Sequence, residues 1–315
     1  MDVSHRLASA SEEGGFASAC ARGVSEAEPD DTVSRMTEHS APATSFRDRV
    51  RGSGYVLPFV LVHVGAAAAL LQGFSAEGVL LFATVFSLQA FGVTAGYHRY
   101  FSHRSFKTSR GFQLVLATLG TLSVQKGVLW WAAHHRRHHR FTDVAGDPHS
   151  PRDGLLWSHV GWFLSPESAP TDRSAVRDLA AYPELEWLDE HFVVPPLVLA
   201  VALFAGFGAT GLLWGFFLST TAAWHLTYAV NSLGHRVGSR PFETKDDSRN
   251  SFVLALLTFG EGWHNNHHRF PSSVRQGLRW WEVDVTYALL RGLAALGVVW
   301  DLVEPPRSAL GSGSS

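Results

Sequence analysis

Long apolar stretches divide this chain into membrane-like and polar parts. Four of them, at residues 55–71, 79–96, 192–207 and 212–230, contain no Asp, Glu, Lys or Arg. A helix that crosses the bilayer core needs roughly 20 apolar residues at about 1.5 Å each, and these stretches come close to that length. Short linkers at 72–78 and 208–211 join them in two pairs. The pattern predicts an all-α integral membrane protein with four transmembrane helices in two hairpins, rather than buried helices of a large soluble core.

The basic residues predict how these hairpins are oriented. All 26 Lys and Arg lie before the first hairpin, between the hairpins or after the second, and neither linker contains one. By the positive-inside rule, both termini and the middle segment are expected on the cytosolic side of a multi-pass membrane protein.

Two other apolar stretches, at 112–124 and 283–300, are not counted as spans. If 112–124 crossed the bilayer, the histidines before and after it would be separated by the membrane, so we expect it to be re-entrant, interfacial or buried. The stretch 283–300 contains Arg291 and is expected to be an amphipathic helix at the membrane surface. Residues 1–50 lack an apolar period and are predicted to be a disordered tail without a secretory signal. The membrane domain is expected at 51–304, followed by a flexible tail at 305–315.

Composition narrows the possible functions. The 26 basic and 28 acidic residues among 315 nearly cancel, which gives no reason to expect a nucleic-acid partner. The single cysteine, Cys20, excludes a disulfide scaffold, a cysteine-ligated zinc module and an iron–sulfur cluster held by this chain alone. The 17 histidines, in contrast, point to a nitrogen-rich metal site.

Nine of the 17 histidines cluster at the predicted cytosolic ends of the spans. Two H-x-x-H-H runs place residues at i, i+3 and i+4, which share one face of a helix, and one histidine follows Asn231 by four residues. The step from His98 to His103 is five residues, which suits a regular helix poorly and predicts a helix end or a kink. The nine are His98, His103, His135, His138, His139, His235, His264, His267 and His268.

This set favours a centre of two metal ions. Neutral imidazole suits Fe, Zn, Cu and Ni, and nine rings are too many for one ion but suit two with four or five nitrogens each. Asn231 can join through its amide, directly or through a water. One H-x-x-H-H run alone is more often a solvated basic face, but here such runs recur on one side of the membrane. A metal transporter would instead need ligands near the bilayer midplane. His134, His149 and His159 are candidates to orient the ligating rings.

The motifs around these histidines resemble those of the membrane-bound fatty acyl desaturases, specifically the stearoyl-CoA Δ9 desaturase family. The similarity extends over about residues 50–300 and is carried by five segments: GVTAGYHRYFSHRSF at 92–106, HHRRHHRFTDVAGDPHSPRDG at 134–154, SHVGWFL at 158–164, NSLGHR at 231–236 and GEGWHNNHHRFP at 260–271. Two positions depart from the pattern, since His134 replaces an acid and Asn266 an aromatic residue.

The resemblance implies a four-span enzyme with a cytosolic helical cap and two iron ions held by the nine histidines, with Asn231 holding a metal-bound water. It also implies insertion of a cis double bond between carbons 9 and 10 of a saturated long-chain acyl-CoA, with O2 and two external electrons. An acyl-lipid desaturase and a membrane fatty-acid hydroxylase are the alternatives. The sequence contains no nucleotide fingerprint or haem-attachment motif, so the electron donor is expected to be a ferredoxin, a cytochrome b5-like protein or a flavoprotein reductase.

Substrate contacts can be proposed as well. Trp131 matches a position that contacts the acyl chain in the family. Phe86 precedes His98 by twelve residues, roughly 18 Å along a helix, so Phe86, with Ala90 one turn nearer the metals, is expected to end the tunnel. Arg and Lys bind phosphates well, and the candidates for a CoA head group are Arg104, Lys107, Arg152 and Arg275.

Overall fold

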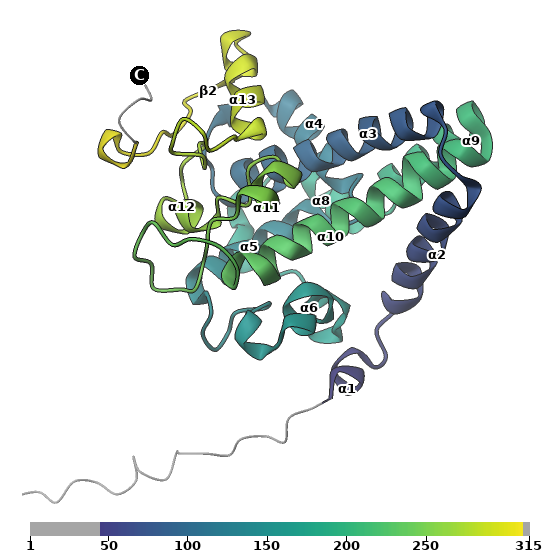
Figure 1. Ribbon diagram of the computed structural model, residues 1–315, viewed down its shortest axis with the longest axis horizontal. Coiled ribbons are helices and arrows are strands. Elements are labelled where there is room, and N and C mark those ends of the chain that lie inside the picture. Colours follow the sequence, from purple (N-terminus) through teal and green to yellow (C-terminus); the bar gives the residue numbers. More distant parts are fainter. Residues whose placement is uncertain (1–44, 311–315) are drawn as a thin grey trace, which may run out of the picture. The chain divides into compact units, whose positions relative to one another are not determined.

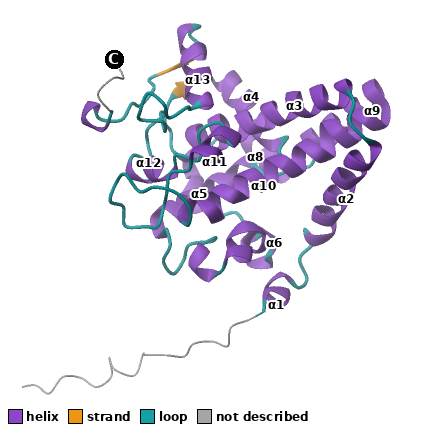
Figure 2. Ribbon diagram, viewed as in Figure 1, coloured by secondary structure: helices purple, strands orange, loops and turns teal. Residues whose placement is uncertain are grey.

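The computed structural model describes residues 45–310, and this part is predominantly helical (Figure 2). Residues 1–44 and 311–315, which belong to the two expected tails, lie outside the described residues. A short helix, α1 (Phe46–Val50), begins before the expected start of the membrane domain, and a 3-10 turn, η8 (Arg307–Ala309), follows its expected end. The two strands of the described part, β1 (Lys107–Thr108) and β2 (Val299–Trp300), pair antiparallel.

The first pair of apolar stretches forms α2 (Val56–Gln72) and α3 (Ala76–Phe91). The Ser75 hydroxyl accepts a hydrogen bond from the backbone N–H of Gly78 at 3.0 Å and so starts α3. The helix then continues without a break as the π-helix η1 (Gly92–Ser102). By length and composition, Ala76–Ser102 suffices to cross a membrane, whereas α2 has 17 residues and is slightly short.

The second pair forms α9 (Val194–Thr210), the π-helix η6 (Gly211–Leu218) and α10 (Ser219–Ser232), which ends in the turn η7 (Leu233–His235). The chain reverses at Gly208, whose φ of 58° and ψ of −143° favour glycine. A Cβ at Gly211 would lie 2.2 Å from the carbonyl oxygen of Leu203, so the two arms approach more closely than a larger residue would permit. The stretch from Val194 to His235 is also apolar and long enough to cross a membrane.

The two hairpins pack against each other. The segment η6 contacts both α2 and α3, and α10 contacts α2 and α3 as well. Figure 1 shows α3 and α10 running alongside each other toward the part of the chain that contains α12 (His264–Arg269). The last turns of both hairpins therefore lie in the same region.

The apolar stretch at 112–124 lies largely in α4 (Arg110–Thr121), which packs against η1. Its 12 residues extend about 18 Å, less than the roughly 30 Å of the bilayer core, so α4 does not span alone. The next helix, α5 (Val128–Phe141), carries the second histidine run. The carboxylate of Asp189 accepts hydrogen bonds from the N–H groups of Leu129 and Trp130, both at 2.9 Å, and anchors the start of α5.

Short elements complete the described chain. Between the hairpins they are η2 (Pro151–Asp153), the π-helix η3 (Trp157–Gly161), α6 (Trp162–Leu164), η4 (Pro166–Ser168), η5 (Arg173–Val176), α7 (Arg177–Ala180) and α8 (Pro183–Glu190). After the second hairpin they are α11 (Phe252–Leu257), α12 and α13 (Val285–Ala295). The last of these lies inside the expected amphipathic stretch and packs against η1.

Candidate metal centre

The five-residue step from His98 to His103 is explained by the π-helix. In η1 the hydrogen bonds join residues five apart, and the N–H of His103 donates to the carbonyl oxygen of His98 at 3.2 Å. Residues at this spacing share a face of a π-helix, so both rings point the same way, with centroids 4.9 Å apart. The expected kink or helix end is thus a π-helix that runs up to its C-cap, His103.

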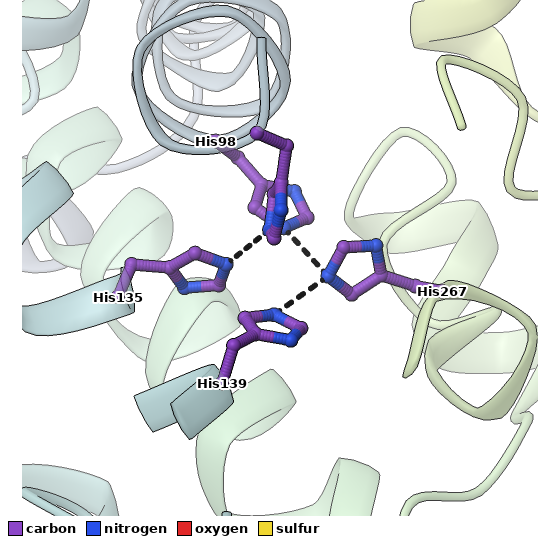
Figure 3. Close-up of side chains that lie close together, drawn as sticks. His98, His135, His139 and His267 are labelled. Carbon is purple, nitrogen blue, oxygen red and sulfur yellow. Dashed lines mark hydrogen bonds between the residues drawn. The ribbon is translucent and has the colours of Figure 1, made fainter. Parts of the chain in front are cut away.

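All nine histidines of the sequence motifs converge, and they form two groups. The first group has five rings, from η1 and its cap, α5 and α12: His98, His103, His135, His139 and His267. Their Nε2 atoms face one another, at 2.7 Å for His103 and His135, 2.9 Å for His139 and His267, and 3.1 Å for His98 and His267. Figure 3 shows four of these rings pointing toward a common centre.

The second group has four rings, from α5, η7 and α12: His138, His235, His264 and His268. The Nε2 of His264 lies 2.9 Å from that of His235 and 3.1 Å from that of His268. The Nε2 of His138 is buried and has no hydrogen-bond partner among the described residues. A buried imidazole nitrogen that has no hydrogen-bond partner and faces three other imidazoles is in the position of a metal ligand.

Each H-x-x-H-H run is divided between the two groups. On α5, His135 and His139 belong to the first group while His138 belongs to the second. On α12, His267 belongs to the first group and His264 and His268 to the second. The runs therefore share a helix face, as expected, but each one contributes to both groups and connects them.

Carboxylates bind the outer nitrogens of four of these rings. The Nδ1 atoms of His138, His235 and His268 lie 3.0, 2.9 and 3.0 Å from carboxylate oxygens of Asp147, Asp143 and Asp246. In the first group, Nδ1 of His98 pairs with Glu261. An imidazole that donates its Nδ1–H to a carboxylate is fixed in the tautomer whose Nε2 carries a lone pair. These four rings therefore present lone pairs to the group centres.

This arrangement fits two cations. In the second group, the Nε2 lone pairs of three rings point toward one centre. Their protons are on Nδ1, so these Nε2 atoms cannot hydrogen-bond to one another, and a cation between them would offset the repulsion of the lone pairs. Nitrogens at about 2.1 Å from one metal ion and at right angles to each other would be separated by about 3.0 Å. The Nε2 separations of 2.7 to 3.1 Å agree with that value. The donor set, imidazole nitrogen alone, is one that iron and zinc accept.

Burial keeps these imidazoles in the neutral form that can bind a metal. It lowers the pKa of His135, His138, His139, His264 and His267 well below the usual value of 6.5, and the mutual repulsion of the clustered rings lowers the pKa further. The rings are therefore neutral at physiological pH and need no deprotonation before an ion binds.

Buried ion pairs hold the first group in place. The Arg99 guanidinium is 1% exposed and donates to Glu261 at 3.1 Å and to Asp284 at 3.0 Å. Glu261 thus joins the ring of His98 to Arg99, the next residue on the same helix. Sequence reasoning missed this carboxylate, although its position three residues before His264 was a signal. Asp246 had no such signal, because it lies in a loop far from any histidine motif.

A second arginine ties the first two histidine motifs together. Arg136, on α5, donates to the carbonyl oxygens of Phe101 at 2.7 Å and Ser102 at 3.1 Å, where η1 ends. It also pairs with Asp178 at 2.7 Å. Carbonyl groups at a helix end lack partners within the helix, so a cation there is stabilising. Arg136 therefore fixes η1 relative to α5.

Two cavities adjoin the histidines. The larger has a volume of about 240 Å³ and the smaller about 60 Å³, and both are lined by Trp131, His135, Thr227 and Asn231. The smaller one is also lined by Phe86 and Ala90. The structure therefore places all three expected tunnel residues on the cavity wall. The Asn231 side chain faces both cavities and has no hydrogen-bond partner among the described residues.

The four head-group candidates do not line either cavity. Three are paired with acids: Arg104 with Asp178 at 2.7 Å, Lys107 with Asp301 at 2.9 Å and Arg152 with Asp247 at 2.8 Å. The fourth, Arg275, donates to the carbonyl oxygen of Gly277 at 2.6 Å. The structure brings none of these cations to the cavities near the histidines.

The other singled-out positions have structural contacts. His149 stacks on His138 with centroids 4.2 Å apart, and His134 Nδ1 lies 2.9 Å from the carbonyl oxygen of Trp130. His159 contacts His225 at 3.0 Å rather than the nine rings. Asn266 donates from its amide to Glu282 at 2.8 Å, so this departure from the family pattern is satisfied locally.

Comparison with known proteins agrees with this geometry. The model of the family described as fatty acid desaturase matches residues 37–301. The sn-1 stearoyl-lipid 9-desaturase of Synechocystis sp. is 38% identical over 255 residues, which cover 80% of this chain and 80% of that protein. Delta-9 acyl-lipid desaturase 1 of Arabidopsis thaliana is 37% identical, covering 71% and 74%. The acyl-CoA C20 Delta5-desaturase of Anemone leveillei is 37% identical, covering 68% and 70%.

Proposed function

This chain belongs to the fatty acid desaturase family, and on that premise we propose that it is an O2-dependent desaturase with two iron ions. It inserts a cis double bond between carbons 9 and 10 of a saturated long-chain acyl group. The observation that carries the proposal is the pair of five- and four-imidazole groups beside two largely apolar cavities. His98, His103, His135, His139 and His267 would hold one ion and His138, His235, His264 and His268 the other.

The chemistry requires a bound metal. An unactivated methylene has no acidic proton and no leaving group, so side-chain acids and bases cannot attack it. Iron held by the two histidine groups would supply the oxidising power that removal of the two hydrogen atoms requires. O2 is reduced to two waters with two electrons and two protons from outside the chain. The protein itself contributes position, orientation and exclusion of water.

The residues of the cavity wall would determine which carbons of the acyl chain lie beside the imidazoles. Adjacent carbons of a saturated chain are chemically alike, so selecting one pair requires both ends of the chain to be fixed. Trp131 stacks against His135 with ring centroids 5.0 Å apart, at the place where the two cavities meet. Phe86 stands at the wall of the smaller cavity, in T-shaped contact with Phe259 at 6.0 Å, and would stop the methyl end. The Asn231 amide would hold a water beside the ions.

We place four spans in the membrane, with both termini and the nine histidines on the cytosolic side. The positions of α2, α3, α9 and α10, and the absence of Lys and Arg from both hairpin linkers, support this topology. Labelling of single cysteines introduced at Gly73 and Ala209 from the outside of intact cells tests it. Label at residues 245 or 307 from that side would contradict it.

The carrier of the acyl group is a separate question. Relatives at nearly equal identity carry names with lipid-linked and CoA-linked substrates. The larger cavity reaches the surface at the exposed residues Gly54, Pro58 and Val193, at the starts of α2 and α9. In the proposed topology these residues lie at the membrane boundary, where a glycerolipid can enter. Because the four basic head-group candidates lie elsewhere, this opening favours a glycerolipid over the acyl-CoA expected from sequence.

Electrons must come from another protein. The reaction consumes two electrons, and a ferredoxin, a cytochrome b5-like protein or a flavoprotein reductase are the candidate donors. The direct test is iron-loaded protein, a reductant and O2, with stearoyl glycerolipid and stearoyl-CoA supplied side by side. Mass spectrometry should show loss of two hydrogens and a double bond at carbon 9. A gain of one oxygen would instead identify a hydroxylase.

A further inference from the structure

A lysine lines the larger cavity. Lys126 is 7% exposed and is the only Lys or Arg among the residues that line either cavity. The other lining residues near it are mostly aromatic or aliphatic. An ammonium group is strongly hydrated in water, so a lysine side chain is seldom buried without a partner.

The Lys126 ammonium has few partners in the described part of the chain. Its Nζ lies 3.5 Å from the carbonyl oxygen of Ser168, at the limit of a hydrogen bond. It also lies 4.0 Å from the ring centroid of Tyr55 and 4.3 Å from that of Trp130, both of which line the same cavity. No carboxylate of the described residues is within 4.0 Å, and the nearby acid Asp189 is occupied by the N–H groups at the start of α5. The ammonium therefore retains donors that can serve a ligand.

The backbone fixes this lysine in place. Lys126 has a φ of 63°, in the left-handed region that few non-glycine residues adopt, and Val124 nearby has a φ of 57°. The Tyr97 hydroxyl donates to the carbonyl oxygen of Lys126 at 3.0 Å and holds this conformation. The ammonium is thus presented from a defined point just before α5.

We propose that Lys126 binds the carbonyl oxygen of the ester or thioester that links the acyl chain to its carrier, and so fixes how far the chain enters the cavity. This inference rests on the proposed function. The only polar group of a saturated acyl chain is its carbonyl group, and a charged hydrogen-bond donor in an apolar cavity is well suited to bind it.

The position of Lys126 relative to α5 is consistent with a role in fixing the depth of the acyl chain. Lys126 lies two residues before α5, whose first residue, Val128, precedes His135 by seven residues, about 10 Å along the helix. A carbonyl group held at Lys126 would therefore leave a fixed length of chain between itself and the histidines. Phe86, which lines the smaller cavity, would set the limit for the methyl end. Together the two residues define which carbons lie beside the imidazoles.

The competing interpretation is structural, with Lys126 merely joining its loop to Tyr55 and Trp130 through cation–π contacts. The test compares ligands that differ only in the carbonyl group: stearoyl glycerolipid against its octadecyl ether, and stearoyl-CoA against S-octadecyl-CoA. Binding to the metal-loaded protein is measured for wild type, Lys126→Met and Lys126→Arg. Lys107→Met, at an exposed lysine outside the cavities, is the matched control.

Wild type and Lys107→Met should bind the carbonyl-containing ligands roughly tenfold more tightly than the ethers. Lys126→Met should bind both alike, and Lys126→Arg should retain part of the preference. Products of Lys126→Met should also spread to neighbouring double-bond positions. A full ester preference in Lys126→Met, or tighter binding of free stearate than of the ester, would overturn the proposal. Binding is read independently of turnover, so a wild-type protein that prefers the ester but desaturates nothing would refute only the proposed function.

Discussion

The Nε2 atoms of His139 and His267 lie 2.9 Å apart, although one residue is on α5 and the other on α12. Neither ring has a carboxylate partner in the described residues, and the Nδ1 of His267 is buried without any partner. Two imidazoles whose Nε2 atoms lie this close, with ring planes at 88° to each other, are not explained by their packing alone. Their shared neighbour in the proposed account is a metal ion of the first group.

Glu261→Gln should weaken metal binding at the first group. The amide keeps the shape of the side chain but removes the charge that fixes the His98 tautomer, while Arg99 retains Asp284. Changing such an outer partner lowers metal affinity by about 10- to 100-fold. Metal titration followed by mass spectrometry checks this, with Glu77→Gln, in the first turn of α3, as the control. Wild-type affinity in Glu261→Gln would show that the carboxylate does not support a metal ligand.

Asp246→Asn should act on the other ion. Asp246 holds His268, which belongs to the second group, so the ion of the first group should remain bound. Iron content should fall toward one per chain at limiting iron, and Mössbauer spectra of Asp246→Asn and Glu261→Gln should lose different signals. Loss of both ions together in each variant would contradict two separately supported groups.

Phe86→Ala should lengthen the preferred acyl chain. Phe86 lines the smaller cavity, so removing the ring would enlarge that cavity. Ala90→Phe should act in the opposite direction, because it fills the same cavity one turn nearer the imidazoles. Product profiles from a mixture of chain lengths measure both effects. Leu88→Ala serves as the control, since that side chain is 43% exposed and faces away from the cavity. An unchanged profile in Phe86→Ala would remove its role as the tunnel end.

Substrate binding should weaken above about pH 8. Burial lowers the pKa of Lys126 from 10.5 to about 8, with partial compensation from Asp189. Below that pH the ammonium is charged and binds the carbonyl group, and above it the neutral amine binds less well. Other groups beside it are the Tyr55 ring and His134, which burial keeps neutral by lowering its pKa to about 4. The KM for the ester substrate should therefore rise between about pH 7 and 9 in wild type. A rise of equal size in Lys126→Met would assign it to another group.

Much of the helix arrangement could be predicted from sequence, because a long apolar run without charged residues is rarely stable except as a buried or membrane-spanning helix. The helices α2 and α9 begin within two residues of the expected positions, and the reversal at Gly208 falls at the start of the expected linker. Six of the nine histidines could be selected because the two H-x-x-H-H runs have a helical period. His98, His103 and His235 could be selected because they stand at the ends of predicted spans. The division of the nine into five and four could not be predicted, since it depends on how α5, η1 and α12 are rotated against one another.

The contacts that the sequence could not predict were hidden for physical reasons as well. The partner of Arg104 is Asp178, 74 residues away, so its ion pair is invisible to any local pattern. Asp246 reaches His268 from an irregular loop, where no periodicity marks it. The sequence does not mark Lys126 as a site residue, because a single lysine after an apolar stretch is typical of a membrane boundary. Only the structure shows that Lys126 is buried and lines a cavity.

The proposed function depends on two metal ions held between the nine imidazoles. Iron analysis combined with X-ray absorption spectroscopy of protein purified with its membrane lipids tests it most directly. We expect two iron ions per chain, each in a shell of nitrogen ligands with imidazole scattering, and loss of these shells when His138 and His267 are replaced together. A single ion per chain, or iron that survives this double replacement unchanged, would contradict it.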